Sequence, residues 1–109
     1  MLRFVRKLLG KKSQEEILLE VVRRGAYVID VRTPSEYKAG HIQQAVNISL
    51  EQIANNAEKI KKFGKPVITC CQNGGRSGRA RRILKRKGIE VYNGGGWVNL
   101  KDLIRMANS

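Results

Sequence analysis

Short apolar runs along the chain alternate with longer stretches in which apolar residues recur every three or four positions. Apolar runs of four or five residues fit strands that are buried on both faces of a sheet. They lie at Tyr27–Val31, Ala45–Ile48, Pro66–Cys70 and Ile89–Tyr92. Strands that alternate with helices predict an α/β fold with a mostly parallel central sheet, flanked by helices on both faces.

Three of the predicted helices begin at a capping box, in which a hydroxyl and a side chain three residues later satisfy free amide groups of the first turn. The pairs are Ser13 with Glu16, Thr33 with Glu36 and Ser49 with Gln52. We expect the first helix to end near Arg24, the second to be short and the third to end near Phe63. Two further helices are expected at about 77–87 and 97–107.

The chain has 109 residues, which is the size of one domain. We interpret residues 13–109 as that domain and the basic segment 1–12 as an N-terminal extension. No apolar run approaches the ~20 residues of a membrane-spanning helix, so no membrane span is expected.

The net charge of +13 favours the binding of small anions or of an acidic partner. A nucleic-acid-binding domain is also expected to show stacking aromatic residues or a known reading element. Aromatic residues make up only 6% of the chain. With no reading element in the sequence either, no nucleic-acid partner is predicted.

The two cysteines, Cys70 and Cys71, are adjacent. Neighbouring cysteines rarely form a disulfide because the geometry is strained. One histidine and two adjacent cysteines do not have the spacing of a zinc site, so no metal is predicted. Free thiols indicate a reducing compartment, and we expect the protein to be cytoplasmic.

The most informative segment is VITCCQNGGRSG (Val67–Gly78), where a buried strand ends at a cysteine shortly before a helix begins. Ligands of α/β proteins bind at the carboxyl ends of strands. Gly74 and Gly75 let the backbone amides turn inward as an anion-binding nest, beside the positive end of the helix. A cysteine held there should have a pKa below the free value of ~8.5. Arg76 offers a fixed positive charge and two parallel donors for an oxyanion.

Two spacings of cysteine and arginine overlap in this segment. Neighbouring strand residues face opposite sides of a sheet, so only one cysteine faces the loop. From Cys71 to Arg76 the spacing is C-x4-R, with a six-residue loop. From Cys70 the spacing is C-x5-R-S, which matches the phosphate loop of Cys-dependent phosphatases. The local spacing leaves both cysteines open as the nucleophile.

The rest of the chain resembles the rhodanese family of sulfurtransferases. The segment Ile29–Ser49 contains the motifs DVR, EY, GHI and A-x-N-I in the order of the first rhodanese signature. CQNGGRS (Cys71–Ser77) resembles the active loop of that family, and KGIEVYNGGGW (Lys87–Trp97) resembles its closing region. The resemblance runs from about Ser13 to the C-terminus and implies a rhodanese-like fold.

This resemblance implies that Cys71 is the nucleophile and forms a persulfide. The six-residue loop is similar to that of sulfurtransferases, whereas phosphatases related to this fold have a loop one residue longer. The implied activity transfers a sulfane sulfur from thiosulfate, a polysulfide or a persulfide to a thiol or cyanide, with no metal or organic cofactor. The implied partners are a small anionic sulfur donor and a thiol or protein acceptor. The substrate-binding residues implied by the resemblance are Gln72, Asn73, Gly74, Gly75, Arg76 and Ser77.

Structural roles are implied for other residues of the signature. The single histidine, His41, is expected to be structural and not a catalytic base. Asp30, Arg32 and Glu36 are expected to form a charge network that joins the first strand to the short helix. Gly75 stands at a position that commonly carries a side chain in the family.

Two alternatives to a sulfurtransferase follow from the same residues. A phosphatase using Cys70 needs a general acid, and no aspartate stands out for that role. A non-catalytic sulfur carrier or persulfide sensor would act only with a protein partner, and the basic surface suits an acidic one.

Overall fold

The computed structural model describes residues 10–109. Residues 1–9 of the predicted extension at 1–12 therefore lie outside the described residues. Four parallel strands form one sheet in the order β2-β1-β3-β4. Their bounds are β1 Tyr27–Asp30, β2 Val46–Asn47, β3 Val67–Cys71 and β4 Val91–Gly96. β3 is an interior strand, and all five of its residues are buried.

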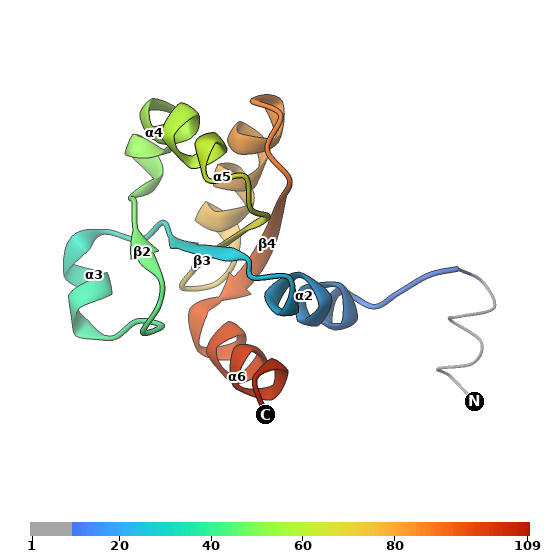
Figure 1. Ribbon diagram of the computed structural model, residues 1–109. Helices are drawn as coiled ribbons and strands as arrows, with labels where there is room; N and C mark the ends of the chain where they lie inside the picture. The colour runs from blue at the N-terminus through green and yellow to red at the C-terminus, as the bar shows by residue number, and fades with distance from the viewer. Residues whose placement is uncertain (1–9) are drawn as a thin grey trace.

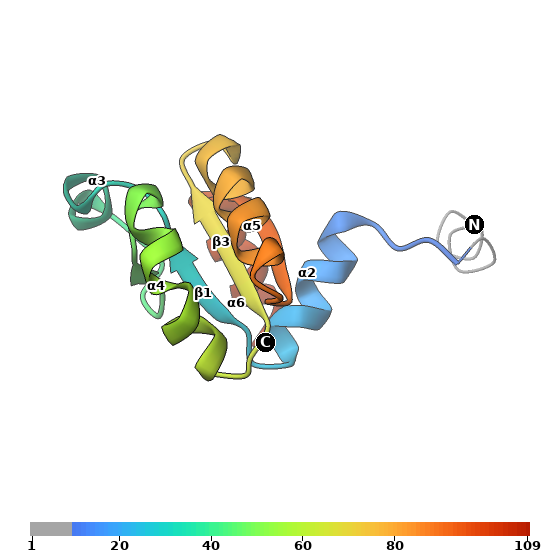
Figure 2. The same cartoon turned by 90° about the horizontal axis from the view of Figure 1, so that it is seen from above.

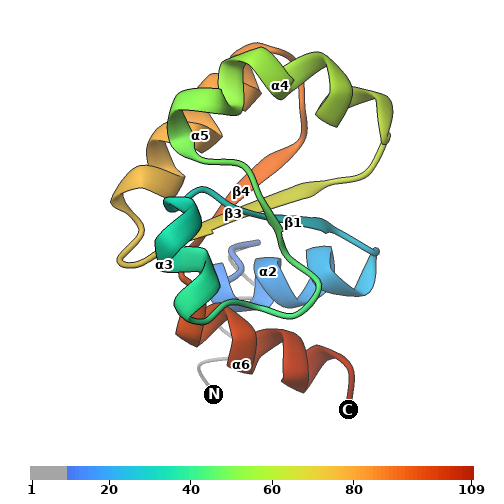
Figure 3. The same cartoon turned by 90° about the vertical axis from the view of Figure 1, so that its left-hand side faces the viewer.

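Helices cover both faces of this sheet. Their bounds are α2 Gln14–Arg23, α3 Pro34–Ala39, α4 Leu50–Lys62, α5 Gly75–Arg86 and α6 Trp97–Ala107. α4 and α5 lie on one face, and α2 and α6 lie on the other (Figures 1 and 3). α3 lies near the carboxyl ends of β1 and β3, close to the start of α5 (Figure 3). The predicted α/β fold, with a parallel sheet flanked on both faces, is confirmed.

The side chains of β3 alternate between two separate cores. Val67 and Cys71 belong to the core beneath α4 and α5, whereas Ile68 and Cys70 belong to the core beneath α2 and α6. This is the alternation that the pleat of a strand imposes on neighbouring residues. The two thiols therefore point to opposite faces of the sheet.

Two of the three predicted capping boxes are present. Ser13 with Glu16 begins α2, and Thr33 with Glu36 begins α3. Ser49 does precede α4, but its side chain makes no capping hydrogen bond, so the predicted box with Gln52 is wrong. The N–H of Gln52 instead donates to the carbonyl oxygen of Ser49 at 2.8 Å, which satisfies this amide through the backbone.

β4 differs most from the predicted strand at Ile89–Tyr92, because it continues to Gly96. Three consecutive glycines usually argue against a strand. Here a Cβ atom at Gly94 would lie 2.7 Å from Ile68 Cγ2 and 2.9 Å from the carbonyl oxygen of Thr69. Glycine therefore allows β4 to pair closely with β3 up to the strand end that carries Cys71.

Candidate active site

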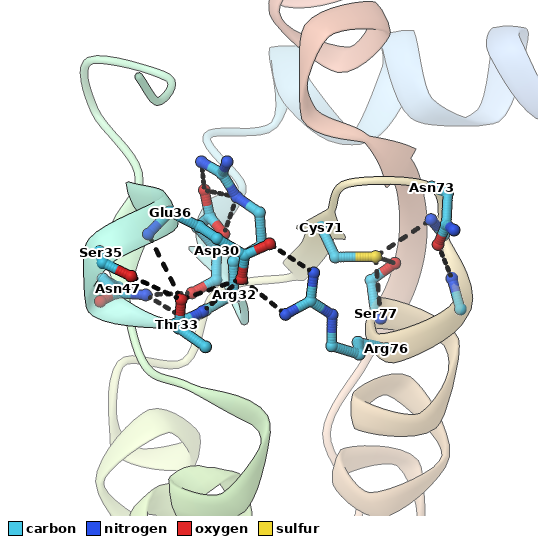
Figure 4. A network of polar contacts seen from close by, with 12 residues as sticks. Asp30, Arg32, Thr33, Ser35, Glu36, Asn47, Cys71, Asn73, Arg76 and Ser77 are labelled. Atoms are coloured by element: carbon cyan, nitrogen blue, oxygen red, sulfur yellow. Dashed lines mark hydrogen bonds and ion pairs between the residues drawn. The ribbon is translucent and has the colours of Figure 1, made fainter. Parts of the chain in front are cut away.

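Cys71 is the last residue of β3 and is followed directly by the loop that leads into α5. Its Sγ accepts hydrogen bonds from the backbone N–H of Gly74 at 3.0 Å and of Ser77 at 3.4 Å. Gly74 is the N-cap of α5 and has a φ of 94°, in the left-handed region that favours glycine. The predicted amide nest is thus formed around the sulfur of Cys71 (Figure 4).

The loop lowers the pKa of the Cys71 thiol. Burial opposes ionisation, but hydrogen bonds with Ser77 and with the backbone N–H groups of Asn73 and Gly74 outweigh it. The Ser77 hydroxyl also lies 3.3 Å from Sγ and can accept a hydrogen bond from the protonated thiol. Cys71 is therefore placed to react as a thiolate, the nucleophilic form of cysteine.

Cys70 has the opposite environment. It is fully buried in the core beneath α2 and α6, and burial together with the nearby Asp30 carboxylate raises its pKa to about 12. Its thiol points away from the loop. The geometry gives no support to a phosphatase that uses Cys70.

The other loop residues differ in exposure and in role. The side chains of Gln72 and Asn73 are exposed. Asn73 Oδ1 accepts a hydrogen bond from the N–H of Gly75 at 3.2 Å, which fixes the turn before α5. Gly75 has room for a side chain, since an added Cβ would lie 3.5 Å from Asn73 Oδ1. The loop therefore presents backbone amides to Cys71 and polar side chains to solvent.

Arg76 forms an ion pair that the sequence prediction did not include. Its two terminal nitrogens donate to both carboxylate oxygens of Glu36, at 2.7 Å and 2.9 Å (Figure 4). This pair joins α3 to the first turn of α5. The hydrogen bond from Arg76 has the largest effect on Glu36 and, together with hydrogen bonds from Thr33, lowers its pKa to about 2. The carboxylate therefore stays charged. The guanidinium is thereby held in one place beside the loop.

Asp30 and Arg32 form a separate, buried ion pair. Arg32 Nη2 donates to Asp30 Oδ2 at 2.7 Å and to the carbonyl oxygen of Gly40 at 2.7 Å. The guanidinium carbon of Arg32 also lies 4.9 Å from the ring centroid of Trp97. The predicted single network is therefore divided: Arg32 joins β1 to the end of α3, and Glu36 bonds to Arg76.

His41 packs against α3. Its ring stacks on that of Tyr37 with centroids 3.7 Å apart, and Nδ1 lies 2.7 Å from the carbonyl oxygen of Tyr37. Both contacts hold the turn after α3. No hydrogen bond joins His41 to Cys71 within residues 10–109, so the geometry assigns His41 a structural position.

Asn93 on β4 is the residue that sequence reasoning missed. Its Oδ1 accepts hydrogen bonds from Ser77 Oγ at 2.6 Å and from the N–H of Gly95 at 2.9 Å. Its Nδ2 donates to the carbonyl oxygen of Gly74 at 3.1 Å. Asn93 stands in the closing segment that resembles the rhodanese family, but no chemical feature of that segment linked it to Cys71.

Metal and membrane features are limited to two findings. Across residues 10–109, no three His, Cys, Asp or Glu side chains come together as ligands for a metal ion. No helix in that part of the chain is long and apolar enough to cross a membrane.

With the fold and the loop geometry established, comparison with known proteins identifies the family. Residues 11–102 match the Rhodanese-like domain. The chain belongs to the rhodanese family of sulfurtransferases. Over 77 residues it is 38% identical to the thiosulfate sulfurtransferase PspE of Escherichia coli, and the match covers 69% of this chain and 71% of PspE. The resemblance seen in the sequence is thus confirmed.

The chain is also similar to an uncharacterized protein and to a solved rhodanese structure. Over 71 residues the chain is 46% identical to the uncharacterized protein YqhL of Bacillus subtilis; the match covers 64% of this chain and only 56% of YqhL. The fold is similar to a structure of rhodanese with anions from E. coli, with a TM-score of 0.62 and 34% identity, covering 68% of this chain and 89% of that one. The rhodanese-like fold is therefore confirmed as well.

Proposed function

We propose that the protein is a thiosulfate sulfurtransferase that carries sulfur as a persulfide on Cys71. The proposal rests on one observation. Cys71 is the last residue of β3, and its Sγ accepts hydrogen bonds from the amides of Gly74 and Ser77. The same donors that stabilise a thiolate also stabilise the anionic outer sulfur of a persulfide. Family membership and the similarity to PspE support the same chemistry.

The reaction has two displacement steps. The Cys71 thiolate attacks the outer sulfur of thiosulfate, the sulfur–sulfur bond of the donor breaks, and sulfite leaves with the bonding electron pair. A thiolate or cyanide then attacks the outer sulfur of the Cys71 persulfide, and the electron pair of the broken bond returns to Sγ. Neither displacement requires a metal or an organic cofactor.

The proposed binding site is the loop Gln72–Ser77. Its amides hold the anionic donor, and Arg76 adds a positive charge that Glu36 keeps in position. The Arg76–Glu36 pair leaves other N–H groups of the guanidinium without a partner among the described residues. Both cysteines are free thiols, in keeping with the reducing, cytoplasmic setting that we propose.

Intact mass spectrometry after incubation with thiosulfate tests the proposal. The wild-type protein and Cys70→Ser should each gain the mass of one sulfur atom, and cyanide should remove it with formation of thiocyanate. Cys71→Ser should gain none. A gain that persists in Cys71→Ser, or no gain in wild-type protein, would overturn the proposal.

The carrier or sensor alternative predicts a different result in the same experiment. Cys71 would load, but cyanide and small thiols would discharge it slowly while a protein acceptor discharged it fast. Comparing the rate of loading with the rate of discharge by several acceptors separates the two functions.

A further inference from the structure

All the charged side chains of α5 are cationic. The helix sequence GRSGRARRILKR contains six basic residues and no acidic one. Arg79, Arg82 and Arg86 are exposed and are spaced by three and four positions, so they lie along one side of the helix. We call these three residues the α5 arginine stripe.

The charge of the stripe is not compensated within the described part of the molecule. Like charges three or four positions apart destabilise a helix by about 0.2–0.5 kcal/mol per pair. In residues 10–109, Arg76 is the only α5 residue that forms an ion pair. A row of cations with no ion-pair partner in the described residues is suited to an external anionic partner.

The surroundings of α5 extend the positive surface. α4 lies beside α5 on the same face of the sheet (Figures 2 and 3), and exposed lysines occupy its last turn. They are Lys59, Lys61 and Lys62. α4 and α5 together carry nine basic and two acidic residues, whereas α2 and α6 on the opposite layer carry three basic and four acidic residues. The asymmetry gives an anionic partner one preferred face.

The stripe is also joined to the loop of Cys71. α5 begins at Gly75, so the stripe starts about one turn from the loop and continues over a helix of roughly 18 Å. A partner that lies along the stripe and continues past its N-terminal end would meet the loop, where Gln72 and Asn73 are exposed. Docking on α5 would thus place a partner next to the loop that holds Cys71.

We propose that the α5 arginine stripe docks a protein sulfur acceptor whose reactive cysteine is flanked by acidic residues. This inference rests on the proposed function, and it names the acceptor class for the same site. Arginine favours such a partner because its guanidinium binds a carboxylate with two parallel hydrogen bonds. The charge complementarity also speeds the encounter, since opposite charges steer association.

The chemistry of transfer favours a protein thiol over RNA. The acceptor thiolate attacks the outer sulfur, the bond from that sulfur to Cys71 Sγ breaks, and the electron pair stays on Sγ. The products are the Cys71 thiolate and a persulfide on the acceptor, so one thiolate replaces another. Sulfur transfer to a nucleobase needs a carbon centre with a leaving group, which this exchange does not supply.

The test uses full-length protein loaded with sulfur on Cys71 and three synthetic peptides, each with one cysteine flanked by glutamates, by serines or by lysines. Mass spectrometry follows sulfur transfer over time. At low ionic strength the acidic peptide should be sulfurated about tenfold faster than the serine peptide. At high salt the two rates should converge, because salt screens exposed charges.

Charge-reversal variants locate the effect. Arg79→Glu/Arg82→Glu/Arg86→Glu should abolish the preference for the acidic peptide. A matched control, Lys11→Glu/Arg23→Glu/Lys38→Glu, changes the net charge equally at exposed positions off α5 and should keep the preference. Equal loss in both variants, or equal rates with all three peptides, would overturn the proposal.

Two further measurements separate the possible failures. If Cys71 does not load from thiosulfate, the proposed function fails, and binding of a fluorescent glutamate-rich peptide without cysteine still tests the stripe. If an RNA oligonucleotide binds through the stripe while the acidic peptide shows no preference, the surface is a nucleic-acid site and the proposal is wrong. Thermal denaturation of both triple variants confirms that they are folded.

Discussion

Ser77 Oγ donates a hydrogen bond to Asn93 Oδ1 at 2.6 Å, which ties the first turn of α5 to β4. The orientation of the Asn93 amide is fixed, because the N–H of Gly95 can only donate to it and the carbonyl of Gly74 can only accept from it. Asn93 thereby holds Gly74 and Ser77, the two residues whose amides contact Cys71 Sγ. It is a positioning residue for the thiol.

Asn93→Asp should raise the pKa of Cys71. A carboxylate oxygen would replace the Nδ2 donor, face the carbonyl of Gly74 and add a negative charge near the thiolate. We expect alkylation by iodoacetamide at pH 7 to slow about tenfold and the pH midpoint to rise. Asn47→Asp is the control, since Asn47 bonds to the carbonyls of Asp30 and Arg32 and not to the loop. An equal shift in both variants would show that general destabilisation is the cause.

Alkylation should distinguish the two cysteines of the wild-type protein. Because hydrogen bonds lower the pKa of Cys71, its alkylation rate should reach half of its maximum at a pH below the ~8.5 of a free thiol. Cys70, with a pKa near 12 in a closed core, should remain unmodified while the protein is folded. Cys70→Ser should leave the profile unchanged and Cys71→Ser should abolish the reaction. A fast thiol in Cys71→Ser would contradict the assignment.

Arg76→Ala should impair thiosulfate more than an uncharged persulfide donor. A charge-assisted hydrogen bond to an anion contributes about 1.5–3 kcal/mol, so KM for thiosulfate should rise at least tenfold. KM for the uncharged donor should change little. Glu36→Gln is the companion variant, because it leaves Arg76 charged but removes its anchor on α3. Equal loss with both donors would mean that Arg76 only organises the loop.

The Asp30–Arg32 pair should matter for stability and not for sulfur chemistry. Both side chains are buried, and removal of one partner leaves an uncompensated charge, so Asp30→Ala should lower the free energy of unfolding by about 3–5 kcal/mol. Glu90→Ala breaks an exposed pair with Arg24 and should have a much smaller effect. Chemical denaturation measures both. Similar losses would show that burial does not set the strength of the Asp30–Arg32 pair.

Gly94→Ala should destabilise the protein although it adds only one methyl group. The added Cβ would lie 2.7 Å from Ile68 Cγ2 and 2.8 Å from Leu100 Cδ2, so the core beneath α6 must shift. Overpacking of this kind costs about 1–3 kcal/mol. Gly75→Ala is the matched control, since its Cβ finds only ordinary contact with Asn73 Oδ1. Equal melting temperatures for the two variants would contradict this account.

Local patterns predicted the elements well where the physical signal is local. The capping boxes at Ser13 and Thr33 depend on residues three positions apart, and both are formed. The apolar side chains of β3 by themselves indicate that this strand is buried, and all of its residues are buried. The prediction failed at Gly94, where pairing with β3 overrides the weak strand propensity of glycine.

The sequence by itself determined the α/β fold, the resemblance to the rhodanese family and a cysteine-containing loop at the end of a buried strand. Only the tertiary structure showed, through contacts and without the family resemblance, which thiol faces the loop. The pleat of β3 places Cys70 and Cys71 in different cores. The tertiary structure also decided the partners of Arg76 and Ser77, since Glu36 and Asn93 lie 40 and 16 positions away along the chain. Contacts between distant segments depend on how strands and helices pack, and spacing along the sequence does not record them.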